Sequence, residues 1–331
     1  MHPSAIRRCS SVLILLVAMG VADNSLATSV GFVTKWGALG TAPGQLNGPE
    51  QIAVGSDGNI YVAENRNCRI QVFTSVGTFV RMWGTQGDGD GQFGMGGLVG
   101  VAVGPDGSVY TAERTPNCCI QKFTPDGTFI SKWGCRFGSC PNELDATSGI
   151  AAGTDGFVYV SDFNGRIQKF TGEGVYVKTW GDIGPDECTT GEGPTVMPGF
   201  VQWTPDGRLL AAEDVNHKVN AYTGDGALVR SWGCCILGPG GVSDDGNGHV
   251  YAVEGYHDFV QVYSQDGQFI TQFGSTGDGD GQFHFPTGLA ADASGFVYVS
   301  DLGNNRIQKF RLDAATATKS STWGRVRILY R

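Results

Sequence analysis

One strand-like motif recurs six times along the chain, and it restricts the possible folds more strongly than any other feature of the sequence. Each copy is a short run of apolar and aromatic residues that ends in a carboxylate. The copies are NIYVAE (59–64), SVYTAE (108–113), FVYVSD (157–162), RLLAAE (208–213), HVYAVE (249–254) and FVYVSD (296–301). Successive carboxylates are 49, 49, 51, 41 and 47 residues apart. A unit of this length cannot bury its own small sheet, so the copies must pack against one another.

Other repeated segments complete a four-stranded unit around this motif. An apolar strand precedes it, a strand such as RIQKF (306–310) follows it, and a fourth strand ends in an aromatic residue and a glycine, as in FVRMWG (79–84). Asp-Gly pairs such as Asp57-Gly58 and Asp126-Gly127 separate the strands, as tight hairpin turns require. The pattern predicts an all-β fold, a six-bladed β-propeller of four-stranded antiparallel blades.

The two ends of the repeat region indicate how the ring closes. Residues 32–37 (FVTKWG) are a fourth strand with no first three strands before them, whereas the last repeat has three strands that end at Phe310. We therefore expect the N-terminal strand to complete the sixth blade and remove its open edge. The alternative is the segment TWGRVRILY (322–330), which contains a similar Trp-Gly step at Trp323.

The repeated pattern resembles the NHL repeat. The best local copies are PEQIAVGSDGNIYVAENRNCRIQVF (49–73) and PTGLAADASGFVYVSDLGNNRIQKF (286–310), and the linker GDGDGQF occurs at 87–93 and 277–283. The resemblance extends over residues 31–310 and implies a six-bladed propeller. It implies no single function, because such propellers serve as ligand scaffolds, as platforms for proteins and RNA, and as enzymes.

The first 27 residues differ in character from the repeats. Arg7 and Arg8 precede an apolar run from Val12 to Ala22, and Ser25-Leu26-Ala27 follows as a small-x-small cleavage signal. We interpret residues 1–27 as a signal peptide cleaved after Ala27, with an uncleaved anchor as the competing interpretation. The predicted product is secreted or periplasmic and has no membrane span. Its domains are the propeller, 28–310, and a basic C-terminal tail, 311–331.

The charge balance argues against one class of partner. The chain carries a formal net charge of −9 at pH 7, which disfavours binding to phosphate backbones. We therefore expect no nucleic-acid partner, although some propellers of the resembled family bind RNA. The tail 311–331 is a basic exception, and a solvated chain end is its simplest interpretation. We expect a monomer.

Eight cysteines follow residue 27, and an even number in an exported chain favours disulfides. The loops between second and third strands and the linkers between blades lie on one face of a propeller, which we call the loop face. All eight cysteines are predicted to lie there. Cys135 and Cys140 are expected to bond to each other, and Cys188 to Cys234 or Cys235, or else to the Cys118-Cys119 pair. The remaining cysteine is Cys68. A thiolate metal site is the alternative, but no C-x-x-C spacing occurs.

Two sets of residues raise the question of a metal. His217, His257 and His284 are predicted on the loop face, and an amidating-lyase branch of the resembled family uses a histidine-bound zinc in its channel. Their mixed offsets favour solvated loop residues. The six strand-end carboxylates invite a calcium hypothesis, but their presence in every blade favours a structural cap. We expect no cofactor, with zinc or calcium as the alternative.

The sequence contains no nucleophile elbow, HExxH helix or P-loop. A lactonase of the resembled type would have Glu-Gly-Pro before the first strand, where this chain has Asn47-Gly48-Pro49-Glu50. The prediction is therefore a binding scaffold whose partner is a protein, a peptide or a surface glycan. The alternative is a metal-dependent lyase or hydrolase with its site in the central channel.

The blades differ from one another mainly on the loop face. The irregular insertions are 135–147, 182–198 and the vicinal pair Cys234-Cys235, whereas the opposite face carries short Asp-Gly turns. Repeats that vary on one face usually bind there, because loops vary freely while the stacked core cannot. Ligand contacts are therefore predicted from these insertions and from five residues of the second-to-third-strand loops, namely Arg66, Arg114, Phe163, His217 and Tyr256.

Overall fold

The computed structural model describes residues 27–115, 117–181, 198–213, 217–233 and 240–316. Residues 1–26 of the predicted leader (1–27), most of the insertion at 182–198, and the chain after Thr316, with Trp323, lie outside these residues, as do Cys188, Cys234 and Cys235. The described residues form strands and turns, and this part of the chain contains no helix that could span a membrane.

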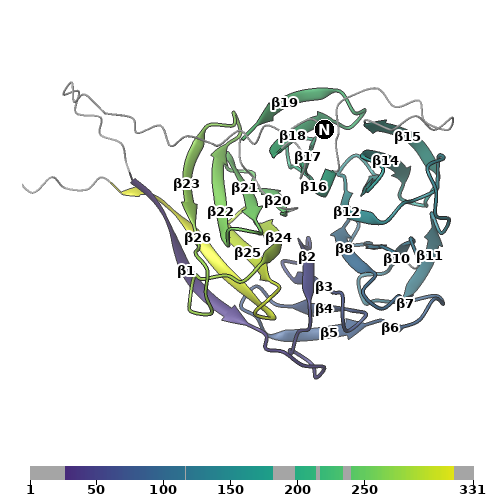
Figure 1. The fold of residues 1–331 in the computed structure, drawn as a ribbon, viewed down its shortest axis with the longest axis horizontal. Coiled ribbons are helices and arrows are strands. Elements are labelled where there is room, and N and C mark those ends of the chain that lie inside the picture. Colours follow the sequence, from purple (N-terminus) through teal and green to yellow (C-terminus); the bar gives the residue numbers. More distant parts are fainter. Residues whose placement is uncertain (1–26, 116, 182–197, 214–216, 234–239, 317–331) are drawn as a thin grey trace, which may run out of the picture. The chain divides into compact units, whose positions relative to one another are not determined.

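Residues 28–314 form one compact unit, in which six sheets of four antiparallel strands are arranged in a ring (Figure 1). The innermost strands contact one another around the axis of the ring. These first strands are β2 (Pro49–Val54), β8 (Leu98–Val103), β12 (Thr147–Ala152), β16 (Pro198–Trp203), β20 (Val242–Asp244) and β24 (Pro286–Ala291). The fold is the predicted six-bladed β-propeller.

The second and third strands carry most of the buried side chains. The second strands are β3 (Ile60–Glu64), β9 (Val109–Glu113), β13 (Phe157–Asp162), β17 (Arg208–Glu213), β21 (His249–Glu254) and β25 (Phe296–Asp301). The third strands are β4 (Arg69–Phe73), β10 (Ile120–Phe123), β14 (Arg166–Thr171), β18 (Lys218–Thr223), β22 (Phe259–Ser264) and β26 (Arg306–Thr316). Their apolar residues form six clusters, each between neighbouring blades, so the blades stabilise one another.

The fourth strands form the outer rim and are only half buried. They are β5 (Phe79–Trp83), β11 (Phe129–Trp133), β15 (Tyr176–Gly181), β19 (Leu228–Trp232), β23 (Phe269–Phe273) and β1 (Ala27–Trp36). The linker after β5 adds a short parallel pair, β6 (Thr85–Gln86) with β7 (Gln92–Phe93). Exposed and half-buried residues alternate along β5 and β11, as expected for strands with one solvated face.

The N-terminal strand closes the ring as predicted. The sheet of the last blade has the order β1-β26-β25-β24, and Phe32 of β1 packs edge to face on Phe310 of β26, with 6.0 Å between the ring centroids. Figure 1 shows the purple strand β1 beside the yellow strand β26. Strand β26 continues to Thr316, so the domain boundary predicted at residue 310 falls inside a strand.

In five blades a tryptophan packs against a glycine of the next blade. A Cβ atom added at these glycines would lie 2.5 to 2.6 Å from the indole of the preceding blade, and each glycine has a positive φ of 78° to 91°. The pairs are Trp36 with Gly77, Trp83 with Gly127, Trp133 with Gly174, Trp180 with Gly226, and Trp232 with Gly267. This contact explains the repeated Trp-Gly and Asp-Gly steps, because only glycine permits both the turn and the close approach.

The carboxylates at the ends of the second strands are structural caps. All six are buried, with 0 to 1% of the residue exposed. Glu64 accepts hydrogen bonds from the backbone N–H of Asn47, at 3.0 Å, and from the side chains of Asn67 and Gln71, both at 2.6 Å. Backbone N–H groups of the incoming linkers likewise donate to Glu113, Asp162 and Asp301, so in four blades the cap joins the blade to the linker that enters it.

Candidate functional site

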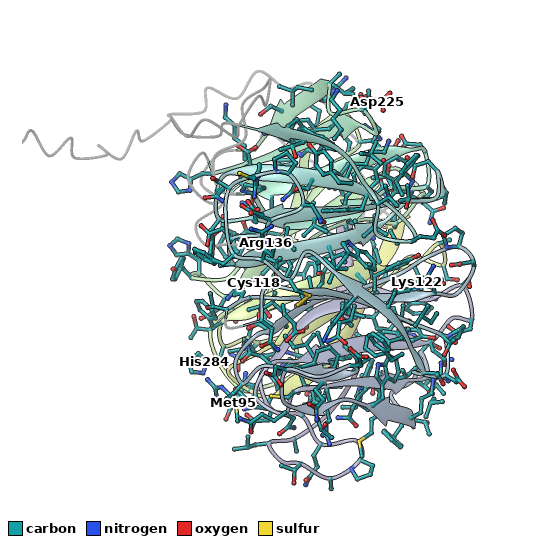
Figure 2. The ribbon with its side chains drawn as sticks, turned by 90° about the vertical axis from the view of Figure 1, so that its right-hand side faces the viewer. Met95, Cys118, Lys122, Arg136, Asp225 and His284 are labelled. Atoms are coloured by element: carbon teal, nitrogen blue, oxygen red, sulfur yellow. A yellow bond between two sulfur atoms is a disulfide. The ribbon has the colours of Figure 1, made fainter. Side chains whose placement is uncertain are left out.

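The two faces of the propeller differ in composition as the sequence predicts. Figure 2 shows Met95, Cys118, Arg136 and His284 toward one side of the molecule, and Lys122 and Asp225 toward the opposite side. The first group belongs to second-to-third-strand loops and linkers, and Asp225 belongs to a tight turn between third and fourth strands. The predicted ligand residues therefore lie on the loop face.

The first cluster surrounds Glu50, the second residue of β2. Glu50 is only 8% exposed, and its carboxyl accepts a hydrogen bond from Asn65 Nδ2 at 3.4 Å. Burial raises the pKa of Glu50 to about 7, against the opposing effect of the positive charges on Arg114 and Arg66. Near neutral pH such a carboxyl is present in both its neutral and its charged form.

Arg66 and Arg114 come from corresponding loops of adjacent blades. The side chain of Arg66 is exposed, whereas Arg114 is half buried, donates from Nε to the backbone oxygen of Thr147 at 3.3 Å, and lies over the ring of Phe163 at 5.5 Å from its centroid. Among the described residues no carboxylate lies within 4 Å of either guanidinium. Two of the predicted contact residues, Arg114 and Phe163, are thus brought into contact by adjacent blades, and the positive charge of Arg66 acts with that of Arg114 on the pKa of Glu50.

Two buried hydroxyls belong to the first strand of the third blade, whose backbone Arg114 contacts. Thr147 is 0% exposed and Ser148 is 4% exposed, and neither hydroxyl has a hydrogen-bond partner among the described residues. Thr147 pairs with its blade's cap carboxylate in the same way that Pro49 does in the first blade, so Ser148 occupies the register position of Glu50. Both hydroxyl oxygens are enclosed by the protein, so they are not exposed on the loop face.

A second, aromatic cluster lies between the last two blades. Tyr256 is exposed and packs edge to face on Phe285, with 5.5 Å between the ring centroids. The backbone N–H of Phe285 donates to Asp258 Oδ1 at 2.7 Å, which ties the two loops together. Of the predicted contact residues, only Tyr256 belongs to this cluster.

His217 is placed by its backbone conformation. Its φ of 55° is left-handed, and the same turn position is left-handed in every blade. The six residues there are Cys68, Cys118, Gly165, His217, Asp258 and Asn305. The structure therefore gives His217 a turn position and does not place it in the Glu50 cluster.

No metal site is found in the part of the chain that the structure describes. No three His, Cys, Asp or Glu side chains there are close enough to hold an ion. His257 Nδ1 lies 3.4 Å from Glu254 and its ring stacks on Phe259, and the backbone N–H of His284 donates to the cap Asp301 at 2.8 Å. The three predicted histidines thus have separate surroundings.

The predicted disulfide between Cys135 and Cys140 is wrong. Cys135 bonds to Cys119, and Cys140 is disulfide-bonded but not to Cys135. The partner could not be read from sequence spacing, because antiparallel pairing returns the end of β11 to the start of β10 and brings Cys135 beside Cys119.

Cys68 and Cys118 are also not in disulfides, contrary to prediction. Both are free and buried, with 1% and 2% of the residue exposed, and burial raises the pKa of each thiol. Each packs in a cluster between two blades, where the thiol acts as a small apolar group.

The axis of the ring is bridged by one side chain. Gln51 Nε2 donates to the backbone oxygen of Ile150 at 2.9 Å, and the N–H of Ile150 donates to Gln51 Oε1 at 3.3 Å. Inner strands of the other blades approach closely at four glycines, Gly100, Gly149, Gly241 and Gly288. A cavity of about 140 Å³, lined by the first strands of four blades, begins at Gln51 and extends toward Trp203.

Glu50 was not among the residues predicted to contact a ligand. A signal exists in the sequence, because Glu50 is the only charged residue at its position among the six first strands. The corresponding residues are Val99, Ser148, Gly199, Gly240 and Thr287. Sequence analysis also missed Met95 and Phe285, whose exposure depends on how the linkers run over the face.

Comparison with known proteins supports the fold assignment. The family model of the NHL repeat matches residues 46–73 and 283–310. E3 ubiquitin-protein ligase TRIM71 of Mus musculus is 32% identical over 31% of this chain and 16% of that protein. Protein brain tumor of Drosophila melanogaster is 35% identical over 25% of this chain and 8% of that protein. NHL repeat-containing protein 3 of Mus musculus is 29% identical over 34% of this chain and 38% of that protein. The chain thus spans well under half the length of these relatives.

Solved structures with the same architecture include enzymes. A streptogramin B lyase has a TM-score of 0.57 at 15% identity, with 88% of this chain and all of the lyase covered. Virginiamycin B lyase from Staphylococcus aureus has a TM-score of 0.56 at 14% identity, covering 86% of this chain and all of that one. A structural-genomics protein of unknown function from Bacteroides thetaiotaomicron has a TM-score of 0.62 at 15% identity, with 86% of this chain and 76% of that one covered. At such low identity the similarity concerns the fold alone.

Proposed function

Because this chain is a six-bladed β-propeller with NHL repeats, we propose that it is an exported scaffold that captures a protein or peptide through its loop face. The basic, apolar and small-residue pattern of residues 1–27 supports export. The bonded cysteines Cys119, Cys135 and Cys140 are consistent with an oxidising compartment. The loops that vary between blades supply the binding surface, and the propeller supplies the rigid support.

The observation that carries this proposal is the distribution of exposed aromatic side chains. Five aromatic residues are classed as exposed in the described part of the chain, and four of them lie on the loop face. They are Phe137, Phe163, Tyr256 and Phe285, with exposed fractions of 67, 43, 63 and 37%. The fifth, Phe269, lies on the outer strand β23. Exposed aromatic and arginine side chains gathered on one face are typical of protein-binding surfaces.

Capture of partners from the native exterior fraction tests the proposal. The purified chain from residue 28 onward is immobilised, and bound proteins are compared between the unaltered protein and the variants Phe163→Ala and Tyr256→Ala. Loss of a specific partner in either variant is expected, since truncation of an aromatic anchor typically costs about 2 kcal/mol or more of binding free energy. Phe269→Ala is the matched control, because it removes an equally exposed aromatic ring from the rim.

Two results would contradict the proposal. Binding would lie on the outer strands if Phe269→Ala abolished partner capture and the two loop-face variants left it intact. An intact N-terminus at Met1 in protein recovered from its native source would contradict export, whereas a mature N-terminus at Thr28 is expected.

A further inference from the structure

A cavity of about 220 Å³ lies between the second and third blades, on the side of the ring opposite the loop face. We call this side the turn face, because it carries the turns that follow the first and third strands. The second blade lines the cavity with Asp106, Tyr110 and Lys122, and the third blade lines it with residues that include Ala152 and Glu173. Figure 2 shows Lys122 on this side of the molecule.

The corresponding place between the third and fourth blades is filled by an indole. Tyr110 and Tyr159 occupy the same position of the second strand, each opposite a lysine of the third strand. Both hydroxyls donate to a glycine oxygen of the next blade, at 3.4 Å for Tyr110 and 3.3 Å for Tyr159. Trp203 of the fourth blade stacks on Tyr159, with 5.1 Å between the ring centroids and 13° between the planes. The two interfaces therefore share one framework, and no indole covers Tyr110.

Two differences in sequence leave the space beside Tyr110. Ala152 stands in the third blade where the fourth blade has Trp203, since each of them pairs with the second residue of its second strand. Ser108 stands in the second blade where the third blade has Phe157, whose ring centroid lies 3.9 Å from the Lys169 ammonium. The interface between the second and third blades therefore lacks two aromatic rings that pack in the next interface.

The lysine that lines the cavity also lacks the contacts of its counterparts. Lys169 and Lys309 donate to a backbone oxygen of the next blade, at 2.8 and 2.9 Å, and each lies over a phenylalanine ring. Among the described residues Lys122 has neither contact, and its ammonium lies 5.5 Å from the centroid of Tyr110. A cation in this place can also contact the face of an aromatic ligand, and an indole most favourably.

The size and charge of the cavity restrict the ligand that it can hold. An apolar cavity of about 150 Å³ admits a benzene ring, so the larger volume here admits a ring system of the size of indole. The charged side chains that line it are Lys122, Asp106 and Glu173. Two of the three are acidic, so an anionic ligand is disfavoured.

We propose that this cavity binds a small, neutral, planar aromatic molecule, which stacks on Tyr110 as Trp203 stacks on Tyr159. The cavity has room for one ring system and is bordered by short turns of both blades, so we assign it to a free molecule and not to a tryptophan of a partner chain. Because the site lies on the turn face, it does not depend on the proposed scaffold function of the loop face.

Small matched probes test this inference on the whole mature protein. Binding of indole is measured by saturation-transfer NMR titration at about pH 7. Phenol and cyclohexanol form a matched pair, because both are neutral and carry one hydroxyl but only phenol is planar and aromatic. Phenol is expected to bind roughly fivefold more tightly than cyclohexanol, the effect of one aromatic contact. Indole-3-acetate, an anion, should bind more weakly than indole.

Variants assign the binding to this cavity. Ala152→Trp supplies the indole of the next interface and should abolish binding of indole, whereas Trp203→Ala should create a second site. Lys122→Met should weaken binding about threefold through loss of the cation, and Lys122 does not line the cavity at the axis of the ring. Val229→Trp is the control for an added indole, because Val229 is exposed on the outer strand β19. Melting curves verify that each variant is folded.

Several results would overturn the inference. Equal binding of phenol and cyclohexanol in the unaltered protein would do so without any variant. Unchanged binding of indole in folded Lys122→Met and Ala152→Trp would place the ligand elsewhere, and loss of binding in Phe163→Ala or Tyr256→Ala would place it on the loop face. Tighter binding of N-acetyltryptophanamide than of indole would assign the cavity to a partner chain, contrary to the proposal.

Discussion

The blades fall into two groups that differ at the first residue of the third strand. In the first, third and sixth blades this residue is an arginine, which pairs with the cap carboxylate at 2.6 Å (Arg69), 2.9 Å (Arg166) and 2.7 Å (Arg306). In the other three blades the position holds Cys119, Lys218 and Phe259. Both groups keep the buried carboxylate, so the carboxylate is the constant element of the fold and the arginine is one of several ways to support it.

The second blade shows what replaces the arginine. Glu113 accepts hydrogen bonds from Gly94 N–H at 2.8 Å and from Asn117 and Gln121 at 3.0 Å. These residues occupy the positions of the partners of Glu64 in the first blade, except that no arginine is present. Burial raises the pKa of Glu113, against the opposing effect of these hydrogen bonds. Cys119, in the arginine position, bonds instead to Cys135 at the start of the next linker. The covalent bond therefore holds the linker that leaves the second blade, whereas the arginines of the other group hold the linkers that enter their own blades.

Removal of an arginine cap should have the largest effect on stability. Arg166 is 1% exposed, pairs with Asp162 and donates to the linker oxygens of Gly138 at 3.0 Å and Glu143 at 2.7 Å. Arg166→Ala leaves a buried charge and several carbonyls unpaired, so it should lower the free energy of unfolding by about 3 to 5 kcal/mol. Lys218→Ala, at the same position of the fourth blade, should cost less than about 0.5 kcal/mol. Similar losses in the two variants, measured by chemical denaturation, would mean that the two groups of blades do not differ.

Loss of the disulfide in the second blade should be the next largest effect. The bond joins residues separated by 16 positions, so Cys119→Ser with Cys135→Ser should cost about 3 kcal/mol. Cys119→Arg with Cys135→Ser introduces the arginine of the other group beside Glu113, and it should recover part of this loss. Thermal unfolding of the three proteins checks the order. An arginine variant less stable than the serine variant would show that the second blade cannot accept the cap of its neighbours.

The smallest predicted effect on stability is that of replacing Glu50, which lies at another position where the blades differ. Glu50 stands where the sixth blade has Thr287, so Glu50→Thr transfers the residue of one blade to another. Burial raises the pKa of Glu50 from its ordinary value of 4.5 to about 7 in the folded protein, so ionisation of the buried group destabilises the fold fully above pH 7 and not below pH 4.5. Glu50→Thr should therefore be more stable than the unaltered protein at about pH 8.5, by on the order of 2 kcal/mol, and not at about pH 4. Melting temperatures at both values test this, and a stabilisation independent of pH would contradict it.

The sequence predicted the features that repeat in every blade. The strand order, the closing strand and the caps each follow from a pattern within one unit, such as FVYVSD followed by an Asn-rich turn. Trp83 and Gly127 were recognised as ends of strands and turns, although their contact with each other became visible only in the structure. The loop-face position of Arg66, Arg114 and Phe163 was also predictable, since topology assigns each loop to a face.

The sequence did not predict the contacts between different units. Cys135 lies five residues from Cys140, yet it bonds to Cys119, because the return of an antiparallel strand outweighs nearness in sequence. Glu50 was passed over because the two arginines that act on it belong to loops of two different blades. The pKa of a carboxyl depends on surroundings that no single repeat contains.

The pattern of neighbouring residues was sufficient to predict the blade, whereas the clusters on the loop face could be recognised only in the assembled ring. A strand period of two, glycine at left-handed turns and a recurring carboxylate are properties of neighbouring residues, so they can be read from one repeat and counted six times. The clusters around Glu50 and Tyr256 arise where blades meet, at residues far apart in the chain. Their distances, burial and charge are set by how the blades pack, because hydrogen bonding and desolvation depend on the groups that surround a side chain in space.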